Sequence, residues 1–220
     1  MKKSILVLAA ALAASTVPVV AHAELSANLA LTSKYKFRGQ DQSNPDKAAL
    51  PAIQGGFDYS TGGFYVGNWN SNVGFGGGTE MDFYGGYGGE VAGMSYDVGI
   101  LQYYYPSETS LDTTEIYGSL GWGPLTAKYS HTVSSKWFGV QDGDGTGYLE
   151  LNGELEVASG ITLVGHLGAT QFSSGAKRTG SVKNYNDYKV GVGFDLGSGF
   201  AAEAAVVGAS EKAFWGDINK

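Results

Sequence analysis

The sequence has 220 residues, a formal net charge of −7, no cysteine, and 35 glycines beside 43% hydrophobic and 13% aromatic residues. The acidic balance argues against a nucleic-acid partner, which needs a basic surface, and the lack of cysteine excludes disulfides, thiol nucleophiles and cysteine metal sites. The hydrophobic content is too high for a disordered chain, so the composition favours one β-rich domain.

The N-terminus has the pattern of a secretory signal. Lys2 and Lys3 precede an apolar run over residues 5–14 that is too short to span a bilayer, and Ala21-His22-Ala23 matches a small-x-small cleavage site. We therefore expect a signal peptide at residues 1–23, export, and a mature domain at residues 24–220; the alternative is a retained membrane anchor. No later stretch reaches 18 consecutive apolar residues, so we expect no transmembrane helix in the mature domain.

The mature chain continues as alternating apolar and polar segments of about ten residues, the length that a tilted transmembrane strand needs. The predicted strands are 25–37, 51–60, 63–72, 79–90, 95–105, 113–122, 125–133, 147–157, 161–172, 185–196 and 200–209. Short connections alternate with long ones, which is typical of an outer-membrane barrel with short periplasmic turns; a soluble β-sandwich, the alternative, mixes its loop lengths. The predicted fold class is all-β, a transmembrane antiparallel up-and-down β-barrel.

The strand count is odd, whereas bacterial outer-membrane barrels have even numbers of strands. The sequence also stops at Ile218-Asn219-Lys220, without the terminal aromatic residue that usually ends the closing strand of such a barrel. We therefore expect about 12 strands, with the last one missing from this sequence. The alternative is that one of the eleven segments is not a strand.

Successive side chains of a strand point to opposite faces, so the sequence divides into an outward and an inward set. We expect the apolar set to face lipid, including Leu149, Leu151, Leu155, Val190, Val192 and Phe194, and to end in an aromatic girdle. The girdle candidates are Tyr35, Phe37, Phe57, Tyr59, Tyr65, Trp69, Trp122 and Phe172. The lumen or pore-lining candidates are Lys34, Lys36, Arg38, Asp58, Glu80, Asp82, Asp97, Glu115, Lys128, Glu150, Glu154, Glu156, Lys189, Asp195 and Glu203.

Part of the chain resembles a known family. The motifs YKFRG (35–39), PAIQGGFDY (51–59), GFY (63–65) and WNSNV (69–73) resemble the TorF-like porins of Gram-negative outer membranes. The match is specific over residues 35–73, and the layout of the rest is compatible with it, including residues 82–86 and 214–217. The resemblance implies an outer-membrane β-barrel of the porin class and brings no catalytic residues; the missing terminal aromatic strand departs from the family pattern.

The inward charges suggest how such a barrel would act. Ten acids face five bases among the lumen candidates, and an acidic wall in a narrow wet channel favours cations. Alternatively, these charges pair and only fill the interior of a small barrel. Arg38, beside Gly39, is either a solute-binding arginine or a residue that orders the adjacent loop.

We therefore expect an outer-membrane porin for passive diffusion of small hydrophilic solutes, leaning towards cations. Its expected partners are outer-membrane lipid and these solutes, with no nucleic acid. The alternative is a non-conducting structural or surface-interaction barrel.

Catalysis and metal binding have little support in the sequence. Residues 141–147 (QDGDGTG) carry acidic oxygens two apart but lack the third acid and the distant glutamate of a calcium loop. The mature chain has two histidines, His131 and His166, and Ser130 lies on the opposite strand face from His131, so the two form no nucleophile–base pair. A barrel lipid hydrolase is the least supported alternative, and we expect no enzymatic activity, no cofactor and no metal.

Overall fold

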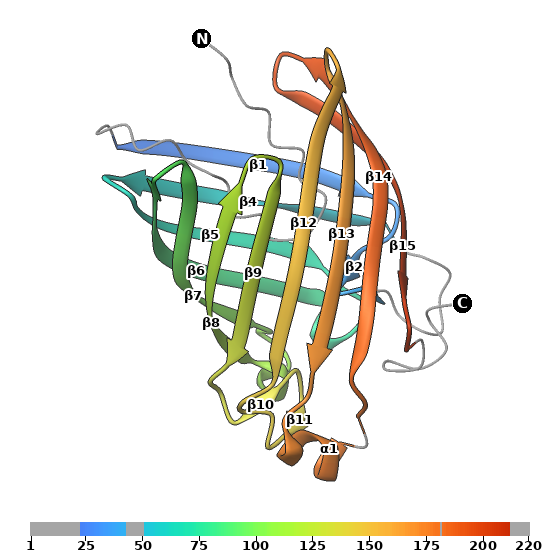
Figure 1. Ribbon diagram of the computed structural model, residues 1–220. Coiled ribbons are helices and arrows are strands. Elements are labelled where there is room, and N and C mark those ends of the chain that lie inside the picture. Colours follow the sequence, from blue (N-terminus) through green and yellow to red (C-terminus); the bar gives the residue numbers. More distant parts are fainter. Residues whose placement is uncertain (1–22, 43–50, 181, 212–220) are drawn as a thin grey trace.

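The computed structural model describes residues 23–42, 51–180 and 182–211 (Figure 1). Nearly all of the expected signal peptide (residues 1–22) lies outside these residues, as do residues 43–50 and the motif at 214–217. The described residues end at Glu211, and the expected loss of a twelfth strand from this sequence stays a prediction.

Eleven strands form one antiparallel sheet in which each strand pairs with its neighbours along the chain. The strands are β1 (Glu24–Thr32), β4 (Ala52–Thr61), β5 (Phe64–Asn72), β6 (Thr79–Val91), β7 (Met94–Tyr104), β8 (Thr113–Trp122), β9 (Leu125–Thr132), β12 (Gly147–Ala158), β13 (Ile161–Gln171), β14 (Tyr185–Gly197) and β15 (Phe200–Ala209). The sheet curves around a common interior, with β1, β4 and β5 crossing behind β12–β14 (Figure 1). The predicted all-β up-and-down fold and its eleven strands are confirmed, and β1 and β15 are the two edges of the sheet.

The two ends of the sheet differ as the connection lengths predict. At one end, which we call the turn end, two-residue turns join β4 to β5, β6 to β7, β8 to β9, β12 to β13 and β14 to β15. Ala92 and Gly93 have φ of 52° and 80°, the pair of positive values that a two-residue hairpin turn requires.

At the other end, the loop end, the long connections carry short elements. These are the hairpin β2–β3 (Lys36–Phe37 and Gln40–Asp41), η1 (Gly76–Gly78), η2 (Thr109–Leu111), the hairpin β10–β11 (Lys136–Trp137 and Val140–Gln141) and α1 (Ser174–Gly180). None of the helices among the described residues is long and apolar enough to cross a bilayer.

The sheet has an apolar outer face and a polar inner face. Side chains expected to point outward do so: Leu149, Leu155 and Val190 are 54%, 56% and 65% exposed. Of the girdle candidates, Phe57, Tyr59 and Trp122 are exposed on the outer face. Inside, buried polar residues such as Gln54, Glu80 and Thr132 lie together with a cluster of buried, mostly aromatic side chains.

The other five girdle assignments are wrong, because Tyr35, Phe37, Tyr65, Trp69 and Phe172 lie inside the barrel or in its loop-end packing. The first strand ends at Thr32, and a bend at residues 33–34 turns Tyr35 and Phe37 inward. In β5, Val66 and Phe64 pair with Tyr59 and Thr61 on the outer face, so Tyr65 and Trp69 point inward. Phe172 follows the last residue of β13 and packs beneath the loops.

Candidate functional site

Two hairpins with the same sequence pattern close the loop end of the interior. Residues 36–39 read Lys-Phe-Arg-Gly and residues 136–139 read Lys-Trp-Phe-Gly. In both, the last two residues form the turn with positive φ: 47° and 74° at Arg38 and Gly39, and 44° and 86° at Phe138 and Gly139. These are the first hairpin (β2–β3) and the second hairpin (β10–β11), and both hairpin turns are two residues long.

The aromatic residues of the two hairpins pack against each other and against the wall. The ring of Phe37 lies 5.6 Å from Tyr103 and 5.5 Å from Phe138, and Tyr103 lies 4.8 Å from Phe138, all edge to face. Trp137 continues the cluster towards Phe172, at a centroid distance of 4.8 Å. This arrangement, favoured by the quadrupoles of the rings, fills the space under the loops.

Arg38 carries the first hairpin into contact with the opposite wall. Its Nη1 and Nη2 donate to Glu115 Oε1 and Oε2 at 3.0 and 2.7 Å, a bidentate pair with side chains 6% and 2% exposed. The guanidinium carbon also lies 4.2 Å from the ring centroid of Tyr148 on β12. Glu115 further accepts long hydrogen bonds from Tyr103 and Thr132, both at 3.4 Å.

Two tyrosines hold the buried carboxyl group of Glu80. Tyr35 donates to Oε1 at 2.7 Å, and Tyr105 donates to Oε2. Burial, together with the nearby Glu80 carboxylate, raises the pKa of both the Tyr35 and Tyr105 hydroxyls well above the usual value. Both tyrosines therefore remain protonated donors at physiological pH.

The stem of the first hairpin is also held by charge. Lys34 and Lys36 contact Asp41 Oδ2 at 2.8 and 3.5 Å, and Asp41 is 1% exposed. Burial lowers the pKa of Lys36, an effect that Asp41 opposes. Gln40 and Gln42 are buried beside Asp41, so the hairpin fills the interior with polar as well as aromatic groups.

Further into the barrel, tyrosine–carboxylate pairs recur. Tyr65 donates to Asp97 at 2.6 Å and also shares a hydrogen bond with Tyr117, and Tyr84 donates to Asp58. Lys128 Nζ lies 4.1 Å from the ring centroid of Tyr117. The wall thus presents aromatic faces beside carboxylates, the environment that attracts cations.

A second network joins β12, β13 and β14. Tyr148 donates to Asp187 at 3.1 Å, and His166 Nε2 lies 2.9 Å from Asp187 Oδ1. On its other side, His166 Nδ1 lies 2.6 Å from Asn152 Oδ1 and 3.7 Å from Glu150 Oε2. The network links Arg38, through the face of Tyr148, to groups nearer the turn end.

The interior is more exposed towards the turn end. Lys189 pairs with Glu203 at 3.1 Å, while Glu154, Glu156 and Asp195 are exposed to solvent. Interior side chains are therefore buried beneath the long loops and more exposed towards the short turns.

The structure brings most of the predicted lumen residues together inside the barrel. Lys34, Lys36, Arg38, Glu115, Lys189 and Glu203 form ion pairs with one another or with Asp41, and Asp58, Glu80 and Asp97 accept from tyrosines. Asp82 and Lys128 are buried, and Glu150 is buried beside His166. Glu154, Glu156 and Asp195 do not join these networks and lie near the turns. Whether the set lines a conducting pore stays a prediction.

Several interior residues were missed from the sequence. Asp187 lies on the same face of β14 as Lys189 but is not among the predicted lumen residues, and neither are the hydrogen-bond donors Tyr103, Tyr105 and Tyr148. The signal for the hairpins was the repeated Lys-aromatic-x-Gly pattern in two long connections.

The weaker motifs gain no support. In the stretch 141–147, Asp142 and Asp144 are exposed, and among residues 23–42, 51–180 and 182–211 no three acidic or histidine side chains are arranged to hold a metal ion. Ser130 is buried in the interior, whereas the His131 ring contacts Tyr129.

Comparison with known proteins gives a family and a weak structural match. A family model described as "Bacterial protein of unknown function (Gcw_chp)" matches residues 16–217. No curated protein matches the sequence. A crystal structure of a double variant of OccD1 (OprD) aligns with a TM-score of 0.39 and 12% identity, over 86% of this chain and 60% of that one. The chain thus spans about 60% of the length of that protein.

Proposed function

The chain belongs to the bacterial Gcw_chp family, whose description assigns no function. We therefore propose a function from the side chains on the two faces of this protein's sheet. We propose that the protein is an exported outer-membrane β-barrel of the porin class, similar to the TorF-like porins. It passes small hydrophilic solutes with a preference for cations, and the first hairpin closes its loop end in the conformation described here.

The observation that carries this proposal is the distribution of side chains between the two faces of the sheet: apolar side chains lie outside and charged ones inside. Leu29, Phe64 and Phe200 are 81%, 65% and 71% exposed on the outer face, while Glu115, Asp187 and Lys128 are buried inside. A soluble protein rarely leaves so large a contiguous apolar surface in water. A lipid-facing sheet with a polar interior is the arrangement of a transmembrane barrel.

The interior chemistry supports the preference for cations. Asp58, Glu80, Asp97 and Asp187 accept hydrogen bonds from tyrosine hydroxyls rather than forming ion pairs with lysine or arginine. A hydroxyl donor satisfies a carboxylate oxygen without supplying a counter-charge, so each ionised carboxylate on the wall contributes a negative potential. Cations entering from the more exposed turn end would be concentrated there.

A second candidate function is a non-conducting structural or surface-interaction barrel. The buried Arg38–Glu115 pair and the aromatic cluster favour it, because together they seal the loop end. In that case the long loops at the sealed end would be the functional surface.

Planar-bilayer recording separates the two candidates. Under a KCl gradient, a cation-preferring channel gives a reversal potential displaced towards the K⁺ equilibrium potential. A barrel that inserts into the bilayer but passes no current under any voltage would support the structural candidate instead.

A further inference from the structure

We propose that Glu115, Tyr148 and Tyr103 on the barrel wall form a binding site for guanidinium cations, which Arg38 of the first hairpin occupies as an internal ligand. This inference rests on the proposed channel function and names the class of solute that its interior would recognise. The remaining residues of the site are Thr132 and Asp82.

The site and its occupant come from different parts of the fold. Glu115, Tyr148, Tyr103 and Thr132 lie on β8, β12, β7 and β9, four neighbouring strands of the sheet. Arg38 instead lies in a turn between two strands of two residues each. The receptor is thus part of the rigid wall, whereas the cation is delivered by a small loop element.

The geometry is selective for a planar guanidinium. Two nitrogens of Arg38 donate to the two oxygens of Glu115 at 3.0 and 2.7 Å, and the same group lies 4.2 Å from the Tyr148 ring centroid. A fork of parallel donors that also stacks on an aromatic face is a property of guanidinium and not of an ammonium group. A free ligand with this group would make the same contacts.

Asp82 is a further buried acidic residue on this part of the wall. It is 1% exposed, lies directly opposite Tyr103 in the β6–β7 register, and is within electrostatic reach of Glu115. Its Oδ1 has no hydrogen-bond partner among the described residues. A buried carboxyl oxygen without a partner is costly, so the wall offers an acceptor that Arg38 leaves unsatisfied.

The occupant lies on a two-residue turn and not on the wall. Arg38 has φ of 47°, in the left-handed region that residues other than glycine seldom adopt. A second cation–π contact lies deeper in the barrel, where Lys128 Nζ lies 4.1 Å from the Tyr117 ring centroid. Displacement of the hairpin would therefore expose a vacant cation site above a wall that continues to attract cations.

Chemical rescue tests the site directly. Arg38→Ala removes the internal ligand, and its thermal midpoint in detergent micelles should fall by about 10 °C, the shift expected when a buried ion pair loses one partner. Methylguanidinium should raise this midpoint saturably, by about 3–6 °C at ten times its Kd. Methylammonium, with the same charge but no fork, should give no saturable rise.

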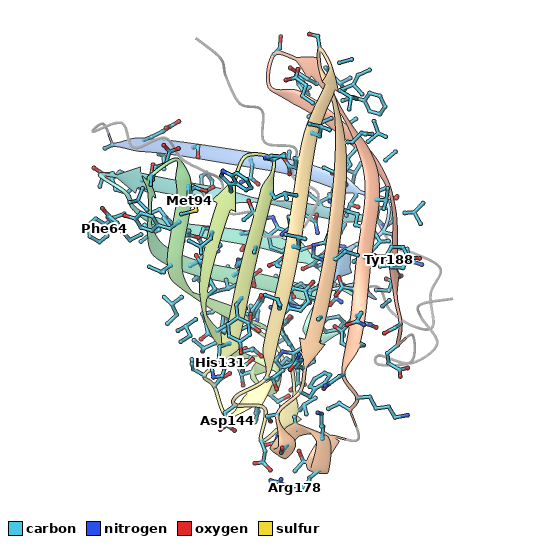
Figure 2. All side chains as sticks on the ribbon, viewed as in Figure 1. Phe64, Met94, His131, Asp144, Arg178 and Tyr188 are labelled. Atoms are coloured by element: carbon cyan, nitrogen blue, oxygen red, sulfur yellow. The ribbon has the colours of Figure 1, made fainter. Side chains whose placement is uncertain are left out.

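Three controls fix the interpretation. Methylguanidinium should not raise the thermal midpoint of wild-type protein, because its site is filled. It should also leave the midpoint of Arg178→Ala unchanged, because Arg178 is an exposed arginine on α1 that points away from the barrel (Figure 2). Arg38→Ala combined with Glu115→Gln should lose the rescue. If Arg38→Ala does not fold, the yield of folded Arg38→Gln on refolding with and without methylguanidinium replaces the midpoint.

The outcomes separate this inference from the channel proposal. Rescue of Arg38→Ala without ion current from any variant would support the site and contradict the channel. Current without selective rescue, or an equal effect of both cations, would overturn the site and leave the channel standing.

Discussion

Phe37 and Phe138 lie at the turns of two hairpins about a hundred residues apart in the chain, and their rings meet edge to face with centroids 5.5 Å apart. The contact joins the first and second hairpins across the mouth of the barrel. Because Arg38 follows Phe37 directly and pairs with Glu115, aromatic packing and charge pairing fix the same element. Closure of the loop end is therefore a property of the two hairpins together.

Phe138→Ala should destabilise the closed loop end. Phe138 is 6% exposed, and removing a buried phenylalanine costs about 3–5 kcal/mol through lost burial and the cavity left behind. Urea unfolding in micelles, followed by tryptophan fluorescence, measures the change. Phe200→Ala, which removes an outward ring that is 71% exposed, is the matched control and should cost much less. Equal losses for both variants would contradict the packing described here.

The Arg38–Glu115 pair should show strong energetic coupling. Either Arg38→Ala or Glu115→Ala leaves a buried partner uncompensated and should cost about 3–5 kcal/mol. The double variant removes both groups and should be far less destabilised than the sum of the two. A double-mutant cycle of unfolding free energies measures this, and strict additivity would mean that the two side chains do not interact.

Gly39→Ala should displace the first hairpin. An added Cβ would lie 2.6 Å from Asp187 Cβ, and the φ of 74° is itself unfavourable for alanine. Gly62→Ala is the control, because Gly62 has φ of 58° but no atom within 4 Å of the added Cβ. We expect Gly39→Ala to accelerate proteolysis of the first hairpin more than Gly62→Ala does. Equal cleavage rates would show that the tip of the hairpin is not seated against β14.

Neutralising inward carboxylates should weaken cation preference. Asp97 lies on the inner wall and Glu150 is buried inside, so Asp97→Asn with Glu150→Gln should move the KCl reversal potential towards zero. Glu154→Gln with Glu156→Gln alters exposed groups near the turns and should have a smaller effect, because solvent screens their charge. The reverse order of effects would assign selectivity to the turn end.

Asp82→Asn should stabilise the protein by about 1 kcal/mol or more, because it removes the ionisable group from a buried position with an unpaired oxygen. Thermal unfolding in micelles measures this change. Destabilisation would mean that the Asp82 carboxyl group already has a stabilising partner.

The sequence was sufficient to predict the strands but not the side-chain contacts in the interior that they enclose. Period-2 alternation and two-residue turns define each strand of the main sheet, since one face meets an apolar environment and the other a polar one. Tyr35 and Phe37 were misassigned because alternation has meaning only while the strand continues, and β1 ends at Thr32.

Tyr65 and Trp69 show a second limit. Both strand faces of β5 carry aromatic residues, so hydrophobicity alone does not give its phase, and the pairing of Tyr59 with Val66 decides it. The inward tyrosines are absent from the lumen candidates because that set was built from charged residues, whereas inside the barrel a tyrosine hydroxyl donates to a carboxylate. Contacts such as Arg38 with Glu115 join residues 77 positions apart and depend on tertiary structure.

The central claim is that the barrel is a cation-preferring channel closed by the first hairpin. Side-by-side bilayer currents of wild type, Arg38→Ala and Arg178→Ala, at equal amounts of inserted protein, test it most directly. The claim predicts mostly closed channels for wild type and Arg178→Ala, and for Arg38→Ala a larger current that still favours K⁺ over Cl⁻. No current from inserted Arg38→Ala, or a current equal to that of wild type, would contradict it.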